Sequence, residues 1–176
     1  EVCLVGSEMC IRDRCDRLED EAQVSIITIQ SEEGLEIMRH TLAAQVLARA
    51  IKNLYPKSKL AIGPTIEDGF YYDVESHEVI SSDDLTKIED EMKNIIKNKS
   101  LLTKKLVSKS EALEIFKQKK EPFKEAIINE SEQKNDFQLY YQDNEEFVDL
   151  CRGPHLPNLG FIGSFKLTKV SGAYSV

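Results

Sequence analysis

The stretch FQLYYQDNEEFVDLCRGPH (residues 137–155) holds a clear strand pattern followed at once by chemically active side chains. Its two apolar runs flank Asp143-Asn144, a pair typical of a turn, so we predict a hairpin of two antiparallel strands. Directly after the second run, Cys151 and His155 stand four positions apart around a Gly-Pro break. By residue type, this pair could be half of a zinc site, a thiol nucleophile with its base, or one wall of a substrate pocket.

The segments on either side of this hairpin mix helix and strand patterns. Residues 22–30 alternate β-branched side chains as a strand does, whereas apolar residues in 31–54 recur at spacings of three and four, as in an amphipathic helix. Because helices are inserted between strands of antiparallel type, we predict an α+β domain with a mixed or antiparallel sheet and packed helices, not a doubly wound sheet. Further strands are expected at 59–75 (two strands and a turn), 100–108 and 161–174, and further helices at 81–99 and 108–120.

The first residues of the chain differ from the rest. The segment LVGSEMCIRDR (residues 4–14) shows no periodicity and leads into no apolar pattern. It equals the in-frame translation of the transposase end of a common sequencing-library adapter, so residues 1–14 are interpreted as an adapter scar and set aside from the fold. A short native tail or a signal peptide is the competing interpretation, although the segment lacks a long apolar core and a small-residue cleavage site.

The amino-acid composition is typical of a globular protein. Apolar residues make up 41% and charged residues 31%, and no apolar run is long enough for a bilayer, so we expect no membrane partner. With Cys3 and Cys10 in the scar, only Cys15 and Cys151 remain, which is no disulfide framework and favours a cytoplasmic location. The net charge of −8 argues against nucleic-acid binding driven by charge alone.

Five blocks of sequence follow one another along the chain: DEAQVSIIT (20–28), EEGLEIMRH (32–40), LYPKSKLAIGPTIEDGFYYDV (54–74), EEFVDLCRGPHLPN (145–158) and FKLTKVSGAY (165–174). In this order they resemble the editing domain of bacterial threonyl-tRNA synthetases, the second additional domain shared with alanyl-tRNA synthetases. The combination of GFYYD with CRGPH is the most specific part of this likeness. The resemblance extends over nearly everything after the scar.

The resemblance implies a domain order. Residues 15–30 correspond to the end of a ubiquitin-like N-terminal domain and a linker, and residues 31–174 to the editing domain. Residues 175–176 would be a truncated end before the aminoacylation core, since the family usually continues with tryptophan where Ser175 stands. The chain is therefore expected to be a fragment without the regions that bind ATP and zinc, activate threonine and read the anticodon.

The resemblance also implies a reaction. Threonine and serine differ by one methyl group, which is worth only ~1–3 kcal/mol of discrimination in a pocket, so a second site must remove serine charged in error. The expected activity is hydrolysis of seryl-tRNA carried on the threonine tRNA, without a cofactor in this part of the chain. The expected partners are the acceptor end of that tRNA with its aminoacyl ester and the rest of the synthetase chain.

His40 matches the first histidine of the family's H-x-x-x-H motif, where it helps to place or activate the attacking water, a task that suits a neutral imidazole. The second histidine is missing, because Ala44 stands four residues after His40. Counting back from AIKNLYP indicates one extra residue and places Gln45 at the histidine's position. On a regular helix Gln45 would be rotated away from His40, unless a local bulge absorbs the extra residue.

Cys151 and His155 match the second half of the family constellation. With His40 they could supply three ligands to a zinc ion, the arrangement of the related alanyl-type editing proteins, which add one more histidine. The threonyl family is regarded as metal-free here, so zinc in this site is not expected. Since nothing local guarantees a low thiol pKa, a cysteine nucleophile is also disfavoured, and the favoured interpretation is a pocket that contacts the seryl group or the terminal ribose.

Four further residues receive roles from the resemblance. Asp149 is expected to read the substrate's amino and hydroxyl groups, as a carboxylate facing an ammonium would. Lys124 is expected to contact the ester or ribose and to stabilise developing negative charge. Tyr71 matches a pocket tyrosine, while Phe70 and Tyr72 are expected in the core. Arg152 is expected to support a phosphate or the loop.

Two other functions remain open at this stage. The chain could be a catalytically impaired module that binds the tRNA acceptor end, its activity lost with the second histidine. It could instead be a free-standing deacylase of the alanyl type, although the strand before the first helix and the SGAY exit both resemble connections to further domains. His77, in a polar turn, receives no role.

Overall fold

The computed structural model describes residues 4–7, 10–12, 25–143 and 147–172. Within these residues, no helix is both long enough and apolar enough to cross a membrane. The elements are β1 (Leu4–Ser7), β2 (Cys10–Arg12), β3 (Ser25–Ile27), α1 (Glu32–Thr41), η1 (Leu42–Leu47), α2 (Ala48–Leu54), β4 (Lys59–Leu60), β5 (Thr65–Ile66), β6 (Gly69–Phe70), β7 (Val74–Glu75), η2 (Ser82–Asp84), α3 (Leu85–Lys97), β8 (Leu102–Val107), α4 (Lys109–Gln118), α5 (Pro122–Glu130), β9 (Phe137–Gln142), β10 (Phe147–Leu150) and η3 (Leu159–Phe161).

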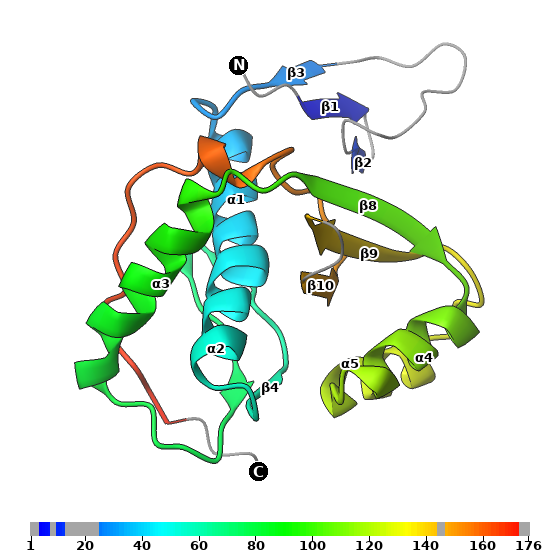
Figure 1. The fold of residues 1–176 in the computed structure, drawn as a ribbon. Helices are drawn as coiled ribbons and strands as arrows, with labels where there is room; N and C mark the ends of the chain where they lie inside the picture. Colours follow the sequence, from blue (N-terminus) through cyan, green and yellow to red (C-terminus); the bar gives the residue numbers. More distant parts are fainter. Residues whose placement is uncertain (1–3, 8–9, 13–24, 144–146, 173–176) are drawn as a thin grey trace.

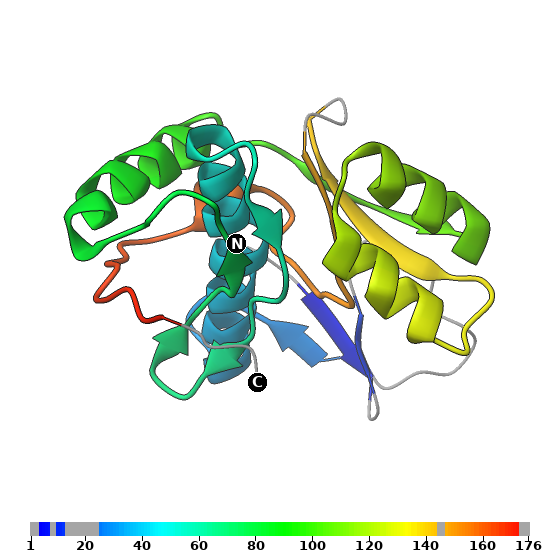
Figure 2. The same cartoon turned by 90° about the horizontal axis from the view of Figure 1, so that it is seen from below.

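The central sheet has the antiparallel order β10-β9-β8, so the predicted hairpin and α+β class are confirmed. Asp143 follows the end of β9, while Asn144 lies outside the described residues. In the register of the hairpin, Asp149 pairs with Tyr140 and Leu150 pairs with Leu139. Because successive residues face opposite sides, the sheet has one apolar face, which packs on α4 and α5, the two helices that lie along the sheet in Figure 2. The other face carries polar side chains such as Gln142 and Asp149 and is called the polar face below.

The helix predicted at 31–54 is present as one continuous column, α1–η1–α2 (Figure 1). Ser31 caps its start by accepting a hydrogen bond from the Gly34 amide at 3.1 Å. Its middle, η1, is a π-helical segment. A π-segment accommodates one more residue than a regular helical turn, so the extra residue inferred from the sequence is taken up here.

The main core lies where this column meets α3 and the strands β4 to β7. Column residues such as Val46 and Ile51 pack with Met92 of α3, and Phe147 of β10 joins them from the polar face of the sheet. The predicted helices at 81–99 and 108–120 are confirmed, the second with the capping box formed by Ser108 and Glu111. Helix α5 was not predicted, although Pro122 at its first turn is a usual start signal.

The strand predicted at 161–174 is wrong for the described part of that segment, because residues 162–172 form no strand. Its alternation is real, since Phe165 and Leu167 pack against the main core. Its backbone is held by a side chain instead of a neighbouring strand: the Leu167 amide donates to Glu89 Oε1 of α3 at 2.8 Å. A strand pattern predicts which side chains point inward, but it cannot supply a partner strand.

The segment set aside as a scar does take part in the fold. Strand β1 pairs antiparallel with β2 and with β3, where Leu4 lies opposite Ile27. Extended backbone pairs through its own amides and carbonyls whatever its origin, so the interpretation of residues 1–14 as an adapter scar stays a prediction. The predicted strand at 22–30 is confirmed at β3. Residues 13–24 and 173–176, which include Cys15 and Ser175, lie outside the described part.

Candidate functional site

The helical column and the polar face of the hairpin bring His40, Cys151 and His155 together. The possible ligand atoms of these three side chains lie within 4.8 Å of one another. His40 Nε2 is 2.8 Å from Cys151 Sγ, and the two imidazole rings stack with centroids 4.7 Å apart and planes 5° apart. His40 is 111 residues before Cys151 in sequence, yet it forms one compact cluster with Cys151 and His155.

His155 is the buried member of this cluster, with only 1% of its surface exposed. Its Nδ1 lies 3.1 Å from Thr41 Oγ1, and the Tyr140 ring meets its face edge-on with centroids 4.5 Å apart. Its other nitrogen, Nε2, is buried without a hydrogen-bond partner. Burial lowers the pKa of His155 well below its ordinary value, and the nearby His40 lowers it further, so the ring is neutral.

The loop that presents Cys151 and His155 depends on Gly153. This glycine has a φ of +63°, and a Cβ atom there would collide with the Tyr140 ring. The same close approach lets the Gly153 amide point at Cys151 Sγ, at 3.4 Å. Glycine is thus required for the bend that turns both side chains toward the column, as expected for a pocket wall.

Lys124 and Asp149 form a buried ion pair beside the cluster. Lys124 Nζ lies 2.8 Å from Asp149 Oδ1, and the two side chains are only 4% and 3% exposed. Asp149 stands on β10 on the same face as Tyr140, whereas Lys124 comes from α5. Both residues predicted from the resemblance therefore lie next to the cluster, but they are already paired with each other.

The electrostatics of the cluster favour neutral groups. Burial raises the pKa of the Cys151 thiol to about 12, with Asp149 as a second cause. Burial also lowers the pKa of His40, an effect that Asp149 and a hydrogen bond to the Gly63 backbone oppose. A thiol with a raised pKa is a poor nucleophile, which disfavours a nucleophilic role for Cys151.

The same three residues form a donor set that suits zinc, since two imidazoles and one thiol leave a fourth position open. The distances fit less well. Ligand atoms bound tetrahedrally at about 2.0–2.3 Å from zinc lie roughly 3.5 Å apart. His40 Nε2 and Cys151 Sγ are closer than that, at 2.8 Å, which is a hydrogen-bonding contact. Binding zinc would require this pair to separate and the thiol to lose its proton.

Gln45 lies in the π-segment, fully buried, and faces β9. Gln142 Nε2 donates to the Gln45 backbone carbonyl at 2.7 Å and to its side-chain Oε1 at 3.1 Å, and Arg49 in turn donates to Gln142 Oε1 at 3.0 Å. This chain of hydrogen bonds leaves Gln45 Nε2 buried without a partner. The side-chain oxygen of Gln45 is therefore engaged, while its amide nitrogen has donors to spare.

The two tyrosines of GFYYD take opposite positions. Tyr71, expected in the pocket, is 45% exposed. Tyr72, expected in the core, packs partly there, but its hydroxyl is buried without a partner. Burial raises the pKa of Tyr72, and so do Asp149, Glu121 and Cys151, which places its hydroxyl in the electrostatic field of the site. Since strand alternation fixes only the side, sequence could not tell whether the inward tyrosine ends in the core or in a site.

Arg152 and His77 lie outside the cluster. Arg152 follows Cys151 directly, but its side chain is exposed, and its role at a phosphate or in support of the loop stays a prediction. His77 is exposed in its turn, so the structure gives it no role either.

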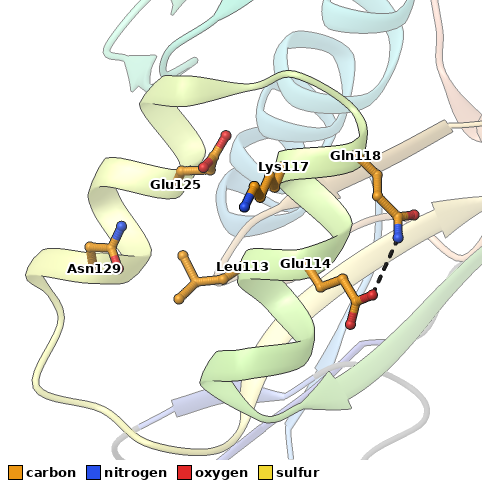
Figure 3. Close-up of a pocket in the computed structure, with 6 residues that line it drawn as sticks. All are labelled: Leu113, Glu114, Lys117, Gln118, Glu125 and Asn129. Atoms are coloured by element: carbon orange, nitrogen blue, oxygen red, sulfur yellow. Dashed lines mark hydrogen bonds between the residues drawn. The ribbon is translucent and has the colours of Figure 1, made fainter.

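A cavity of about 330 Å³ borders the Lys124–Asp149 pair and lies between α2, β10 and the helices α4 and α5. A wider groove of about 630 Å³ lies between α4 and α5 (Figure 3). It is lined by Leu113, Glu114, Lys117, Gln118, Glu125 and Asn129. The smaller cavity therefore contains two of the residues predicted for the site, Lys124 and Asp149, whereas the lining of the wider groove contains none of them.

Comparison with known proteins agrees with this class of domain. Residues 138–175 match the family described as "Threonyl and Alanyl tRNA synthetase second additional domain", and these residues include Asp149, Cys151 and His155. The fold and the cluster thus define an α+β domain of the type found in synthetase editing.

A particular relative extends the likeness to nearly the whole chain. Threonine--tRNA ligase 2 of Bacillus subtilis (strain 168) is 52% identical over 159 residues, which is 90% of this chain. The chain spans 24% of the length of that relative. The resemblance to bacterial threonyl-tRNA synthetases that the sequence blocks indicate is therefore confirmed.

Proposed function

We propose that this chain is the editing part of a threonine--tRNA ligase and hydrolyses seryl-tRNA formed in error on the threonine tRNA. The observation that carries the proposal is the buried cluster of His40, Cys151 and His155 beside the Lys124–Asp149 ion pair. The support comes from the combination of neutral imidazoles with one buried charge pair, which suits ester hydrolysis, and from the synthetase relatives.

In the proposed reaction, a water molecule attacks the ester carbonyl. The bond from the water oxygen to the carbonyl carbon forms, the bond to the ribose oxygen breaks, and the proton of the water passes to that leaving oxygen. His40, neutral because of its burial, orients the water. Lys124 stabilises the negative charge that develops on the carbonyl oxygen. Asp149 accepts hydrogen bonds from the substrate's ammonium group, which shares the carboxylate with Lys124.

The proposed site acts without a metal. The donor set would hold zinc through His40, Cys151 and His155, and such an ion would polarise the ester or a bound water. The proposal does not require this, because the neutral imidazole and the lysine can perform both tasks. Cys151 then acts as a wall that hydrogen-bonds His40. The proposed partners are the acceptor end of the tRNA and the remainder of a synthetase chain, in the cytoplasm.

One observation favours a second function. Gln45 cannot take up a proton, and its oxygen is bonded to Gln142. If the missing histidine were essential, the chain would be a module that binds the tRNA acceptor end without hydrolysing the ester.

The test is hydrolysis of seryl-tRNA and threonyl-tRNA, each charged on the threonine tRNA, with and without a chelator. We expect the seryl ester alone to be lost, at a rate that the chelator does not change and that His40→Ala reduces. Retained acceptor-end binding with hydrolysis at the buffer rate would reject the hydrolase and leave the binding module. Loss of activity in chelator would reject the metal-free site.

A further inference from the structure

Thr41 stands at the centre of the hydrogen bonds that hold His155, although it carries no role in any of the motifs. It is fully buried on the last turn of α1, next to His40. Its Oγ1 has three neighbours: the Ile37 carbonyl at 2.8 Å, the Leu156 amide at 3.0 Å and His155 Nδ1 at 3.1 Å. A hydroxyl has one proton and two acceptor positions, so these three contacts use its full capacity.

The direction of each bond can be assigned. The Leu156 amide must donate to Thr41 Oγ1, because an amide N–H has no acceptor position. The single Thr41 proton then goes either to the Ile37 carbonyl or to His155 Nδ1. The contact with the Ile37 carbonyl is shorter, at 2.8 Å against 3.1 Å, and it is the usual bond of a helical threonine to the carbonyl four residues before it.

The other nitrogen of His155 leads to the same assignment. If Thr41 donated to Nδ1, the proton of the neutral ring would sit on Nε2, which is buried without a partner. A buried N–H without an acceptor is rarer in proteins than a buried acceptor without a donor. With the proton on Nδ1, His155 donates to Thr41, and Nε2 keeps a lone pair.

We propose that Thr41 is a positioning residue that holds His155 in the tautomer with its proton on Nδ1 and so presents the Nε2 lone pair to the site as an acceptor. His155 lies in the cluster with His40 and Cys151, whose possible ligand atoms, one for each residue, are within 4.8 Å of one another. There it takes a hydrogen bond from the attacking water or from a hydroxyl of the terminal ribose. This consequence for catalysis rests on the proposed hydrolysis, whereas the tautomer does not.

The tautomer is measured directly by ¹⁵N NMR of the full 176-residue chain with labelled histidine. We expect a pyrrole-type signal for Nδ1 and a pyridine-type signal for Nε2 of His155 at neutral pH. The opposite pattern would overturn the proposal, whatever the enzymatic activity. This NMR experiment uses the unaltered chain and no substrate. Its result therefore decides the tautomer even if the chain proves unable to hydrolyse seryl-tRNA.

Variants test the consequence. Thr41→Val keeps the shape but removes the hydroxyl, and we expect a mixture of His155 tautomers and a fall in kcat of about 10–100-fold, as for other residues that orient a functional histidine, with little change in KM. Thr41→Ser keeps the hydroxyl and should restore both the tautomer and kcat. Ser100→Ala, which removes another buried hydroxyl away from the cluster, is the matched control and should change neither.

The outcomes are distinguishable. If wild type hydrolyses the seryl ester and Thr41→Val does so equally well, the positioning role is rejected while the proposed function stands. If Thr41→Val proves unstable, Thr41→Ser decides: a folded serine variant with a changed tautomer or reduced kcat would contradict the assignment to the hydroxyl.

Discussion

The β9–β10 hairpin has two buried faces of opposite character. One face presents Leu139, Tyr141 and Val148 to the helices α4 and α5 and is apolar. The other presents Tyr140, Gln142 and Asp149 to the column α1–η1–α2. Two buried polar atoms without a hydrogen-bond partner among the described residues, His155 Nε2 and Gln45 Nε2, belong to side chains that contact this second face. Unsatisfied buried groups are unfavourable for stability, so we expect these two atoms to serve function.

The largest expected effect comes from opening the ion pair on the polar face. Lys124→Ala leaves the Asp149 carboxylate buried without its cation, and we expect a loss of about 3–5 kcal/mol in the free energy of unfolding together with loss of seryl-tRNA hydrolysis. Urea denaturation and a deacylation assay check both.

The matched control replaces the pair. A Lys124→Met, Asp149→Leu double variant should regain most of the stability, because no charge is left unpaired, but none of the activity. An active double variant would show that the ion pair is structural only.

On the apolar face, Leu139→Ala should lower the free energy of unfolding by about 2–5 kcal/mol, because Leu139 is fully buried and leaves a cavity. Below its melting temperature the variant should hydrolyse the seryl ester at the wild-type rate. A large fall in kcat for the folded variant would contradict the claim that the apolar face contributes to stability alone.

Lowering the pH should lower the free energy of unfolding, because His155 is buried in its neutral form beside the polar face. The pKa of His155 lies well below its ordinary value because of burial, so the unfolded chain binds the proton more readily than the folded chain. Neutral His155 makes its whole contribution to the free energy of unfolding above about pH 6.5. This contribution decreases as the pH falls, by about 1 kcal/mol over the first pH unit below 6.5. Thermal melts between pH 7.5 and 5.5 measure this. His155→Gln should flatten the profile, whereas replacing the exposed His77 with glutamine should leave it unchanged.

A smaller effect is expected when the hydroxyl groups of the adjacent Tyr71 and Tyr72 are removed one at a time. Tyr72→Phe removes a buried hydroxyl that has no partner, so stability should stay within about 1 kcal/mol or rise, while hydrolysis falls about tenfold. Tyr71→Phe, at an exposed position, should change neither. Equal rates for the two variants would remove Tyr72 from the site.

The smallest effect is expected at the surface. Arg152→Ala should change stability by less than about 0.5 kcal/mol, because the side chain is exposed. If Arg152 contacts a phosphate, its loss should weaken tRNA binding to a similar extent for every tRNA sequence. The slope of the logarithm of the binding constant against the logarithm of the salt concentration should then decrease in magnitude by about one. An unchanged slope would restrict Arg152 to the loop.

Much of the fold follows from local patterns. The capping box at Ser108 and the strand pattern around Tyr140 each specify their element without distant help. The extra residue before Gln45 left a helical bulge as one alternative to a regular helix, and the structure has a π-segment there. The segment after Phe161 failed as a strand because pairing needs a partner, which alternation cannot provide.

The site was predictable only in part. Resemblance brought His40, Cys151, His155, Lys124 and Asp149 to one place, and the structure assembles them. Thr41, Gln142 and the hydroxyl of Tyr72 could not be found in this way, because their roles depend on neighbours distant in sequence. A threonine in a helix and a glutamine in a strand have no distinguishing local signal.

The most direct test of the functional face is NMR mapping with a stable analogue of the terminal nucleotide, adenosine carrying serine through an amide at the 3′ position. We predict that the analogue shifts the backbone signals of Thr41, Cys151 and His155, and leaves those of Leu139 and of the groove between α4 and α5 unchanged. Shifts confined to that groove, or to the apolar face, would contradict the account.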